Sequence, residues 1–451
     1  MANTSFEDNA NVFVVTLVTL VYWPANLGLS HKKSSKRPPK QKINPLQRGI
    51  TDFLTRYLPP SALIQNDLSL DKLVPTLPKR YTIYEPMLLL PLNAFAHPPA
   101  WGTLYSTLTN EQRQALYACI ANAFGRFGVT HIAINAPIVP LNPQGEANRM
   151  RSPVGLVPLY GDFGAPVSGD REGAQPSEID YEQAFWVRTT QNHGIVQIWA
   201  PLYTMFSRGN VTEKARILGD GSKFEGLDEE TLCGEKVENV AVVDMYAGIG
   251  YFVFSYLKRG VRRVWGWEIN GWSVEALRRG CAENGWGCRV VRVLEDGVVS
   301  TPISELVQSL GDADRIVVFH GDNKFAASVM GEIRAIMEGR QEWTSIRHVN
   351  LGLLPSSSSS WGNACKVIDE RYGGWVHVHE NVDVQSINRK KREITASLGK
   401  SWAEHVSQFT AIQSNTECRH VEHVKTYAPG VMHCVFDLRL SPQHVCLEST
   451  P

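Results

Sequence analysis

One acidic residue and two glycines form the segment of this sequence with the clearest chemical meaning. Asp244 ends an apolar, β-branched run, and Gly248 and Gly250 follow it in the order Asp-Met-Tyr-Ala-Gly-Ile-Gly. Glycine lets a ligand lie against the backbone, because a Cβ atom at either position would occupy that space. A pair of glycines alone is weak evidence, since many turns between strands and helices contain them. The segment predicts a ligand-binding turn at the end of a strand.

A second carboxylate supports this interpretation. Glu268 ends the next predicted strand, 24 residues after Asp244. A carboxylate at that place can accept hydrogen bonds from both hydroxyls of a ribose. The turn lacks the third glycine of the dinucleotide fingerprint, so no pyrophosphate cradle is predicted. The pattern therefore favours S-adenosylmethionine over NAD as the nucleoside ligand.

A carboxylate and an amide follow a third predicted strand. Asp322 and Asn323 come after residues 315–320 in the order His-Gly-Asp-Asn-Lys. Ligands of open α/β sheets bind at the carboxyl ends of strands, where this pair can meet the amino group and a ring nitrogen of adenine. The alternative is an ordinary helix N-cap, because both residue types are also favoured there. Beside the first two motifs, the pair favours an adenine contact.

The second half of the chain must position these residues, and it alternates between strands and helices. Strands are expected at residues 240–245, 264–269, 315–320, 347–354 and 375–379, with helices near residues 251–258 and 273–283. Such an alternation implies a parallel sheet that helices cover on both faces. Residues 295–314 are polar and irregular, and we expect an insertion there, before the third strand.

The first half has a mixed pattern that predicts a smaller α/β domain. We expect a helix at residues 110–127, an extended segment at residues 129–138 and a hairpin whose strands are residues 186–191 and 195–200. Residues 161–176 are rich in Gly, Pro, Ser and charge, which predicts a long loop. The predicted organisation is an extension with a basic, disordered linker at residues 1–45, an auxiliary domain at 46–236, a catalytic domain at 237–440 and a tail at 441–451.

Length and charge set further bounds. A chain of 451 residues exceeds the size of a single hydrophobic core, roughly 250 to 300 residues, so we expect at least two domains. The 45 basic and 45 acidic residues cancel, so any nucleic-acid surface must be a local patch. Residues 12–23 are apolar but fall short of the ~20 residues that span a bilayer, and acidic residues precede them. We therefore expect neither secretion nor membrane insertion.

The cysteine and histidine patterns indicate the redox state of the cellular compartment and whether a metal site is expected. The eight cysteines contain no CxxC pair and no regular spacing, which argues against a zinc site and a disulfide framework. A reducing compartment follows, and we expect a cytoplasmic protein. His377 and His379 alternate with valines and point to the same side of a strand. Since no third ligand has suitable spacing, we expect a packed pair of core histidines and no metal.

Six ordered blocks extend these motifs along the chain. They are residues 205–210 (MFSRGN) with 213–216 (EKAR), 244–252 (DMYAGIGYF) with 267–270 (WEIN), 321–324 (GDNK), 350–357 (NLGLLPSS), 377–382 (HVHENV) and 420–429 (HVEHVKTYAP). From about residue 79 to 438 the chain resembles the tRNA wybutosine-synthesizing protein 2 family, whose relatives include the tRNA guanosine-37 N1-methyltransferases. The NLGLLPSS block selects the first of these, because the methyltransferases carry a shorter Asn-Leu-Pro segment there.

The resemblance implies both a fold and a reaction. The fold is a Rossmann-like class I S-adenosylmethionine-dependent transferase domain preceded by a smaller α/β tRNA-binding domain. The reaction transfers the 3-amino-3-carboxypropyl group of S-adenosylmethionine, a co-substrate, to carbon 7 of 4-demethylwyosine at position 37 of tRNA(Phe), leaving methylthioadenosine. In methyl transfer, the nucleophile attacks the methyl carbon of the same sulfonium and not the carbon of the aminocarboxypropyl group. The placement of the nucleophile therefore decides the product. No strong general base is needed, and we assign no catalytic acid or base.

Two alternatives to this function stay open. The first is N1-methylation of guanosine 37, which would release S-adenosylhomocysteine in place of methylthioadenosine. The second is a tRNA-binding scaffold without catalytic activity, although the intact carboxylates and glycines of the turn argue against it. The resemblance implies the anticodon region of tRNA(Phe) as partner, and the sequence says nothing of the oligomeric state.

The resemblance also implies which residues contact the co-substrate. By match to the family's motif, Ser207 and Lys214 are expected to contact it, with Glu268 on the ribose and Asp322 and Asn323 at the adenine. The ammonium of Lys214 can pair with the methionyl carboxylate and hold the tail in place. Without the family match, a solvated helix lysine would be the better interpretation.

A second group of residues is assigned to the tRNA substrate. Asn210 and Arg216 are expected to bind it, but together with Glu213 they can instead tie the auxiliary domain to the catalytic one. Asn350 and Pro355 are expected to line the base pocket, where an asparagine can read a base edge. The alternative for this pair is a routine strand exit.

Overall fold

A computed structural model describes residues 44–66, 68–135, 156–164, 175–191, 193–407 and 413–443. The described residues belong to one compact unit. Most of the predicted extension and tail, residues 165–174 of the predicted loop, and the hairpin residue Asn192 lie outside the described residues. Within the described ranges, no helix is long and apolar enough to cross a membrane. The predicted domain boundaries stay predictions.

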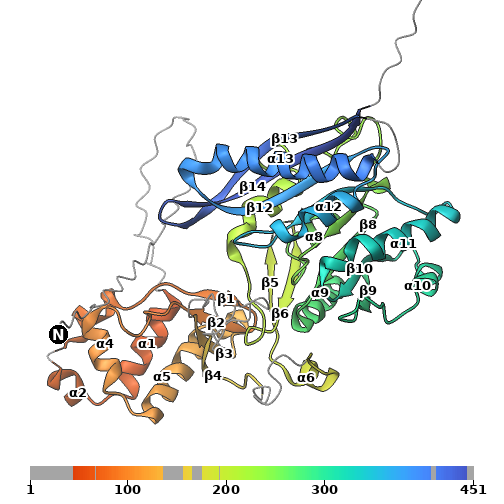
Figure 1. Cartoon of the computed structure of the whole chain (residues 1–451). Coiled ribbons are helices and arrows are strands. Elements are labelled where there is room, and N and C mark those ends of the chain that lie inside the picture. The colour runs from red at the N-terminus through yellow and green to blue at the C-terminus, as the bar shows by residue number, and fades with distance from the viewer. Residues whose placement is uncertain are drawn as a thin grey trace, which may run out of the picture. The chain divides into compact units, whose positions relative to one another are not determined.

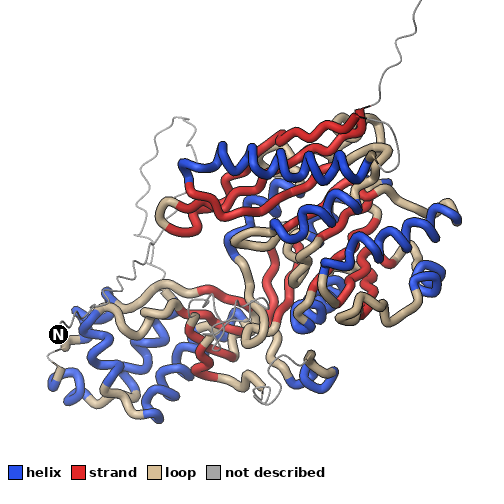
Figure 2. Tube along the Cα trace, in the orientation of Figure 1, coloured by secondary structure: helices blue, strands red, loops and turns tan. Residues whose placement is uncertain are grey.

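The N-terminal part packs helices beside a small sheet (Figures 1 and 2). Its helices are α1 (Pro45–Arg56), α2 (Pro60–Gln65), α3 (Leu70–Leu73), α4 (Pro99–Ser106) and α5 (Asn110–Ala123). Its strands, in sheet order, are β1 (Thr82–Tyr84), β2 (Met87–Leu90), β3 (His131–Ile134) and β4 (Val157–Tyr160). A Cβ at Gly49 would lie 2.7 Å from the Cα of Ile120, so this glycine permits the close approach of α1 and α5. The predicted helix at 110–127 and the α/β character are confirmed.

A separate hairpin follows the short helix α6 (Glu178–Gln183). Its strands β5 (Val187–Gln191) and β6 (Ile195–Trp199) are antiparallel, as predicted. His193 and Gly194 in the turn have φ values of 59° and 82°, a conformation that glycine adopts without strain. The amide of Asn284 fixes the hairpin to the second half of the chain, because it accepts from the Val196 N–H at 3.0 Å and donates to the Val196 carbonyl at 2.7 Å.

The second half is built on a sheet of eight strands. They are β7 (Ala241–Asp244), β8 (Arg263–Glu268), β9 (Gly287–Arg292), β10 (Asp314–His320), β11 (Ile346–Leu351), β12 (Gly374–Asp383), β13 (Gln413–Ala428) and β14 (Val431–Gln443). Their order in the sheet is β13-β14-β12-β11-β7-β8-β10-β9. The five predicted strands are all present, whereas β9, β13 and β14 were not predicted.

The expectation of a purely parallel sheet is wrong at one edge. β14 pairs antiparallel with both β12 and β13. The short connection at Gly430 makes β13 and β14 antiparallel, because strands joined by a tight turn must run in opposite directions. The connection through α13 lets β13 run in the same direction as β12, so β14, which lies between them, runs against both. The sheet is therefore mixed, with a parallel centre that carries the sequence motifs.

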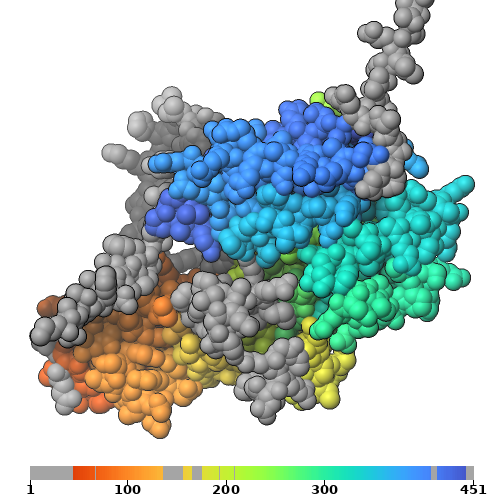
Figure 3. Space-filling view, viewed as in Figure 1, coloured from red at the N-terminus to blue at the C-terminus, as the bar shows by residue number. Residues whose placement is uncertain are grey.

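Helices cover both faces of this sheet. They are α7 (Val211–Ile217), α8 (Val253–Arg259), α9 (Gly271–Glu283), α10 (Ile303–Ser309), α11 (Ala326–Gly339), α12 (Trp361–Val367) and α13 (Ile387–Val406). Alternate residues of β7 enter two cores: Val242 packs with α8 and α9, and Val243 packs with α10 to α13. Residues of α11, α12 and α13 make a continuous surface on this side (Figure 3). The region 295–314, predicted to be irregular, contains α10, whose Leu306 and Val307 are buried.

Candidate active site

The predicted site residues of the sheet meet where its strand order changes direction. From β7 the chain continues to β8 and β10 on one side, whereas β11 and β12 lie on the other. The register places Asp244 at the end of β7 directly beside Asn350 of β11. Ligands of doubly wound sheets bind outside the carboxyl ends of the strands at this switch point. The structure therefore brings together strand ends that are 106 positions apart, 350 minus 244, in the sequence.

Asp244 is held in an unusual electrostatic state. Its carboxylate is fully buried, which raises its pKa to about 7, although the Tyr246 N–H and the nearby Asn350 amide favour the ionised form. One carboxylate oxygen accepts from the Tyr246 N–H at 3.0 Å. Neither the other oxygen nor the Asn350 amide nitrogen has a well-formed hydrogen bond to any described residue. Both atoms are buried, and the Asn350 amide is near enough to the Asp244 carboxylate to lower its pKa, so the two side chains interact with each other.

The glycines of the turn have structural reasons of their own. Gly248 and Gly250 have φ values of 54° and 88°, which other residues rarely adopt. A Cβ at Gly248 would lie 2.8 Å from the ring of Tyr251, and one at Gly250 would lie 2.5 Å from the ring of Phe254. Glycine is therefore required at both positions by the backbone conformation and by the adjacent rings, in addition to the space for a ligand that the sequence predicted.

Glu268 holds this turn against the neighbouring strand. One of its carboxylate oxygens accepts from the Gly248 N–H at 2.9 Å, and the other accepts from the Asn270 N–H at 2.8 Å. A carboxylate has about four acceptor positions, so these bonds are compatible with accepting from ribose hydroxyls. The side chain is half-buried at the carboxyl end of β8.

Asp322 and Asn323 lie at the end of β10 and connect it to the rest of the site. The Asp322 carboxylate accepts from the Lys324 N–H at 3.0 Å, as in the predicted N-cap alternative. The Asn323 amide donates to the Met245 carbonyl at 2.6 Å, and its oxygen accepts from the Ser360 hydroxyl at 3.3 Å. These bonds fix the loop after β10 to the loop after β7. The adenine contact stays a prediction.

Lys214 is a buried cation without an acidic partner in the described ranges. Its side chain is 3% exposed, and burial lowers its pKa to about 7. The ammonium donates to the Gln197 side-chain oxygen at 2.9 Å and lies over the rings of Phe206 and Tyr251, at 5.4 and 5.3 Å from their centroids. Buried ammonium groups are normally paired with a carboxylate. The site therefore fits an anionic ligand group such as the methionyl carboxylate.

The segment that precedes Lys214 adds further polar groups. The backbone N–H of Ser207 donates to the Tyr251 hydroxyl at 3.2 Å, and that hydroxyl donates to the Met205 carbonyl. The side-chain oxygen of Asn210 is buried and has no hydrogen-bond partner within the described structure. The segment is thus anchored to the glycine turn through Tyr251, and it presents an unsatisfied amide.

Arg216 lies in a different environment from these residues. Its guanidinium is buried and forms ion pairs with Glu213 at 2.7 Å and with Asp437 of β14 at 2.6 Å. This geometry is the one expected if the side chain ties α7 to the sheet. The substrate role assigned to it from the resemblance stays a prediction.

The two predicted core histidines are buried and face the same side of β12. His377 contacts Asp437 at 2.7 Å and His348 at 3.0 Å, and the second nitrogen of His348 contacts the Gly226 carbonyl at 2.7 Å. The Gly226 carbonyl can only accept, so the His348 nitrogen beside it donates. Burial, with His377 beside it, lowers the pKa of His348 well below its usual value.

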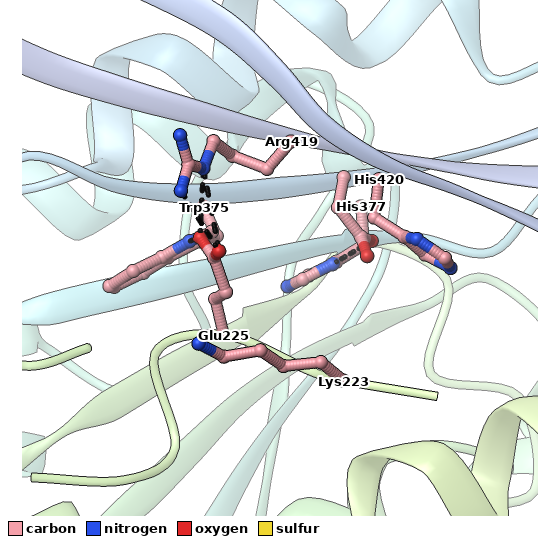
Figure 4. Close-up of a pocket in the computed structure, with 7 residues that line it drawn as sticks. Lys223, Glu225, Trp375, His377, Arg419 and His420 are labelled. Carbon is pink, nitrogen blue, oxygen red and sulfur yellow. Dashed lines mark hydrogen bonds and ion pairs between the residues drawn. The ribbon is translucent and has the colours of Figure 1, made fainter. Parts of the chain in front are cut away.

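A small cavity of about 120 Å³ adjoins this network (Figure 4). His377, Trp375 and Arg419 line it, and the figure shows the ion pair between Arg419 and Glu225 at its rim. In the part of the chain that the structure describes, no group of three or more His, Cys, Asp or Glu side chains can hold a metal ion.

Two residues of the site were not anticipated from the sequence. Gln197 is the hydrogen-bond partner of Lys214, and Tyr251 links the glycine turn to the segment at Ser207. The signal for Gln197 was present, because it alternates with Ile195 and Trp199 on the buried face of a predicted strand. A polar residue on an apolar face is an indication of a special role.

Comparison with known proteins places the chain among named relatives, although no family model matches it. It is 40% identical over 362 residues to the tRNA wybutosine-synthesizing protein 2 of Schizosaccharomyces pombe, a match that covers 80% of this chain and 72% of the relative. The protein of the same name from Saccharomyces cerevisiae is 30% identical over 419 residues, covering 86% and 80%.

Similar solved structures are more distant in sequence. The P. horikoshii TYW2 structure in complex with MeSAdo is 18% identical, with a TM-score of 0.48, and the match covers 88% of this chain and 99% of that chain. The Trm5b structure from Pyrococcus abyssi is 14% identical, with a TM-score of 0.46, and the match covers 83% and 78%.

The doubly wound sheet, with its polar groups at the switch point, is Rossmann-like, and the relatives named above make the class that of the S-adenosylmethionine-dependent transferases. The 40% sequence identity to the S. pombe relative, over most of both chains, narrows the assignment from this class to one family. The chain belongs to the tRNA wybutosine-synthesizing protein 2 family.

Proposed function

We propose that this protein transfers the 3-amino-3-carboxypropyl group of S-adenosylmethionine to carbon 7 of 4-demethylwyosine at position 37 of tRNA(Phe), and releases methylthioadenosine. The observation that carries the proposal is the 40% identity to a named family member over 80% of the chain. The long segment Asn350–Ser357, which ends β11 beside Asp244, supports it at the level of the site.

The residues of the site have separate tasks in this proposal. The bound co-substrate supplies a sulfonium, which is a good leaving group, so the protein must chiefly fix the geometry. Glu268 holds the ribose, and Asp322 and Asn323 hold the adenine. Lys214 pairs with the carboxylate of the tail, assisted by Ser207. Anchors at both ends of the molecule fix which carbon of the sulfonium faces the base.

The base enters from the side of β11 and the segment at residues 207–210. Asn350 and Pro355 line its pocket, and the buried side-chain oxygen of Asn210, which has no hydrogen-bond partner among the described residues, offers an acceptor. The substrate is the anticodon region of tRNA(Phe). We also propose that the protein acts in the cytoplasm, since all seven cysteines in the described ranges are free thiols, as expected in a reducing compartment.

The test is incubation of the purified protein with S-adenosylmethionine and tRNA(Phe) that carries 4-demethylwyosine. The nucleoside is analysed by mass spectrometry and the spent co-substrate by chromatography. A gain of an aminocarboxypropyl group with release of methylthioadenosine is expected. A methyl-sized gain with release of S-adenosylhomocysteine would move the protein to the methyltransferase branch, and tight binding of both substrates without any product would make it a scaffold.

A further inference from the structure

Asn381, near the carboxyl end of β12, has an amide whose two polar atoms are both unsatisfied. Its side-chain nitrogen and oxygen are buried, and neither has a hydrogen-bond partner among the residues that the structure describes. An unsatisfied buried polar group costs about 1 to 3 kcal/mol, so a protein keeps one only for a reason.

The backbone of Asn381 is part of the predicted base pocket. Its N–H donates to the Pro355 carbonyl at 2.9 Å, which attaches β12 to the loop that follows β11. β12 pairs with β11 in parallel, so both strands end at the edge where ligands bind. Asn350, the residue expected to read the base, pairs with His377, so Asn381 lies four residues, about 13 Å, beyond it toward the carboxyl edge of the sheet.

The side chain of Asn381 faces the same side of the sheet as His377 and His379. Side chains two apart along a strand share a face, and Asn381 is the member of this row nearest the carboxyl end. The ring of His379 packs on Phe252, in the segment that follows the glycine turn, with 4.9 Å between the ring centroids. This face of β12 is therefore the one that looks toward the co-substrate turn.

Cross-strand pairing shows which residues lie opposite Asn381 on the neighbouring strands. Asn381 pairs with His433 of β14, and His433 pairs with Lys425 of β13, so the three residues form one row. Neighbouring strands are about 4.8 Å apart, which places Lys425 roughly 10 Å from Asn381. The Lys425 ammonium lies against Gly209, because a Cβ built on that glycine would be 2.0 Å from it. The row that contains Asn381 therefore leads, through Lys425, to residues 207–210, the segment that contains Asn210.

We infer that Asn381 is a specificity-determining residue that reads the edge of the target base with both atoms of its amide. The inference rests on the proposed function. An asparagine amide presents one donor and one acceptor side by side, and it recognises a base edge that offers the complementary pair.

The substitution Asn381→Leu tests the inference, because leucine has a similar shape and no polar atoms. We expect kcat/KM for the substrate tRNA to fall by roughly 5- to 150-fold, the effect of losing a paired contact to a base. The affinity for S-adenosylmethionine should stay within about twofold, since Asn381 contacts only the base. The melting temperature should be unchanged or higher, because an unsatisfied amide has been removed.

Asn284→Leu is the matched control. The Asn284 amide makes hydrogen bonds with Val196 and Gly280, so its loss leaves buried backbone groups unpaired and should lower the melting temperature. If Asn381→Leu lowers the melting temperature as much as the control does, or leaves kcat/KM unchanged, the inference is wrong. Asn381→Ala serves the same purpose if the leucine variant does not fold.

A second readout separates this inference from the proposed function. The wild-type protein should bind tRNA carrying 4-demethylwyosine more tightly than tRNA carrying guanosine at position 37, and Asn381→Leu should reduce that preference. A residue with a purely structural role would weaken both affinities alike, and this result would overturn the inference. If the wild-type protein shows the preference but forms no aminocarboxypropyl product, the proposed reaction fails while base reading by Asn381 is still measured.

Discussion

Replacement of Lys214 by methionine separates the two ends of the co-substrate. Methionine keeps an apolar stem of similar length and removes the charge. A charge-assisted hydrogen bond contributes about 1.5 to 3 kcal/mol, so S-adenosylmethionine should bind roughly 10- to 150-fold more weakly. Methylthioadenosine has no carboxylate and should bind within about twofold of its wild-type affinity. Calorimetric titration of both ligands at pH 6.5 gives these values.

Proton uptake gives an independent test of the same contact. The pKa of Lys214 is about 7, so at pH 8 about nine-tenths of the side chains are neutral in the free protein. Pairing with a carboxylate restores the charged form, and binding of S-adenosylmethionine at pH 8 should take up roughly 0.9 proton. Titration in buffers of different ionisation enthalpy measures this uptake. Any uptake that remains in Lys214→Met comes from the ligand's own amino group and from Asp244, whose pKa is also about 7.

The stability of Lys214→Met should change in the opposite direction to its affinity. The folded-state pKa of about 7 lies below the ordinary value of 10.5, so the unfolded chain binds more protons between these values. Wild-type stability therefore rises with pH across this window, and the full cost of burying the charge is present below pH 7. After allowance for the lost bond to Gln197, the variant should be more stable by roughly 2 to 4 kcal/mol at pH 6.5.

Urea unfolding at pH 6.5 and pH 9.5 measures this difference. The reasoning is refuted if Lys214→Met is less stable than the wild-type protein at pH 6.5. It is also refuted if the variant loses affinity for S-adenosylmethionine and methylthioadenosine by the same factor, because the ammonium would then support the fold of the pocket and not the tail carboxylate.

Three further predictions concern other charged groups of the site. Glu268→Gln should weaken S-adenosylmethionine and methylthioadenosine equally, by about tenfold, because both carry the ribose; calorimetry that finds only the first weakened would contradict this role. The pKa of Asp244, about 7, lies above its ordinary value of 3.8, so wild-type stability falls as pH rises between these values. In urea titrations, Asp244→Asn should remove a fall of roughly 4 kcal/mol in the free energy of unfolding between pH 4 and pH 8. An unchanged pH dependence of stability in the variant would refute this prediction. Arg216→Met should cost about 3 to 5 kcal/mol of stability, because it leaves Glu213 and Asp437 buried without a cation, whereas a loss of tRNA affinity at unchanged melting temperature would restore its predicted substrate role.

The parts of the fold that the sequence predicted are those with a regular apolar pattern. β7, β8, β10 and β11 are central, buried strands; a Val-Val pair marks β7 and β10, and β-branched or aromatic residues mark β8 and β11. β13 is an edge strand with a polar sequence, and no apolar period distinguishes it from a loop. Its pairing with β14 depends on contacts across the sheet, which a local pattern does not contain.

The residues of the site also fall into those that the sequence predicts and those that it does not. Asp244, Glu268 and Asp322 each follow a predicted strand, and strands of a parallel sheet end at one edge, so their meeting could be predicted. The burial of Lys214 could not, because it depends on how the hairpin β5–β6 and α7 pack against each other. The position of Asn381 likewise becomes meaningful only when the row that crosses β12, β14 and β13 is known.

The place of β14 in the sheet has a consequence for how the molecule is made. β14 is the last described strand in the chain, yet it lies between β12 and β13 and pairs with both. A ribosome releases the chain from its N-terminal end, so β12 emerges long before the neighbour that covers its edge. During that interval β12 has an open edge, which is a template for wrong pairing with other chains. Translation through residue 443 is therefore required before this sheet can close. A chain that ends before β14 leaves the edge of β12 open and lacks Asp437, the β14 partner of the Arg216 guanidinium. Chaperones and proteases recognise such incomplete folds.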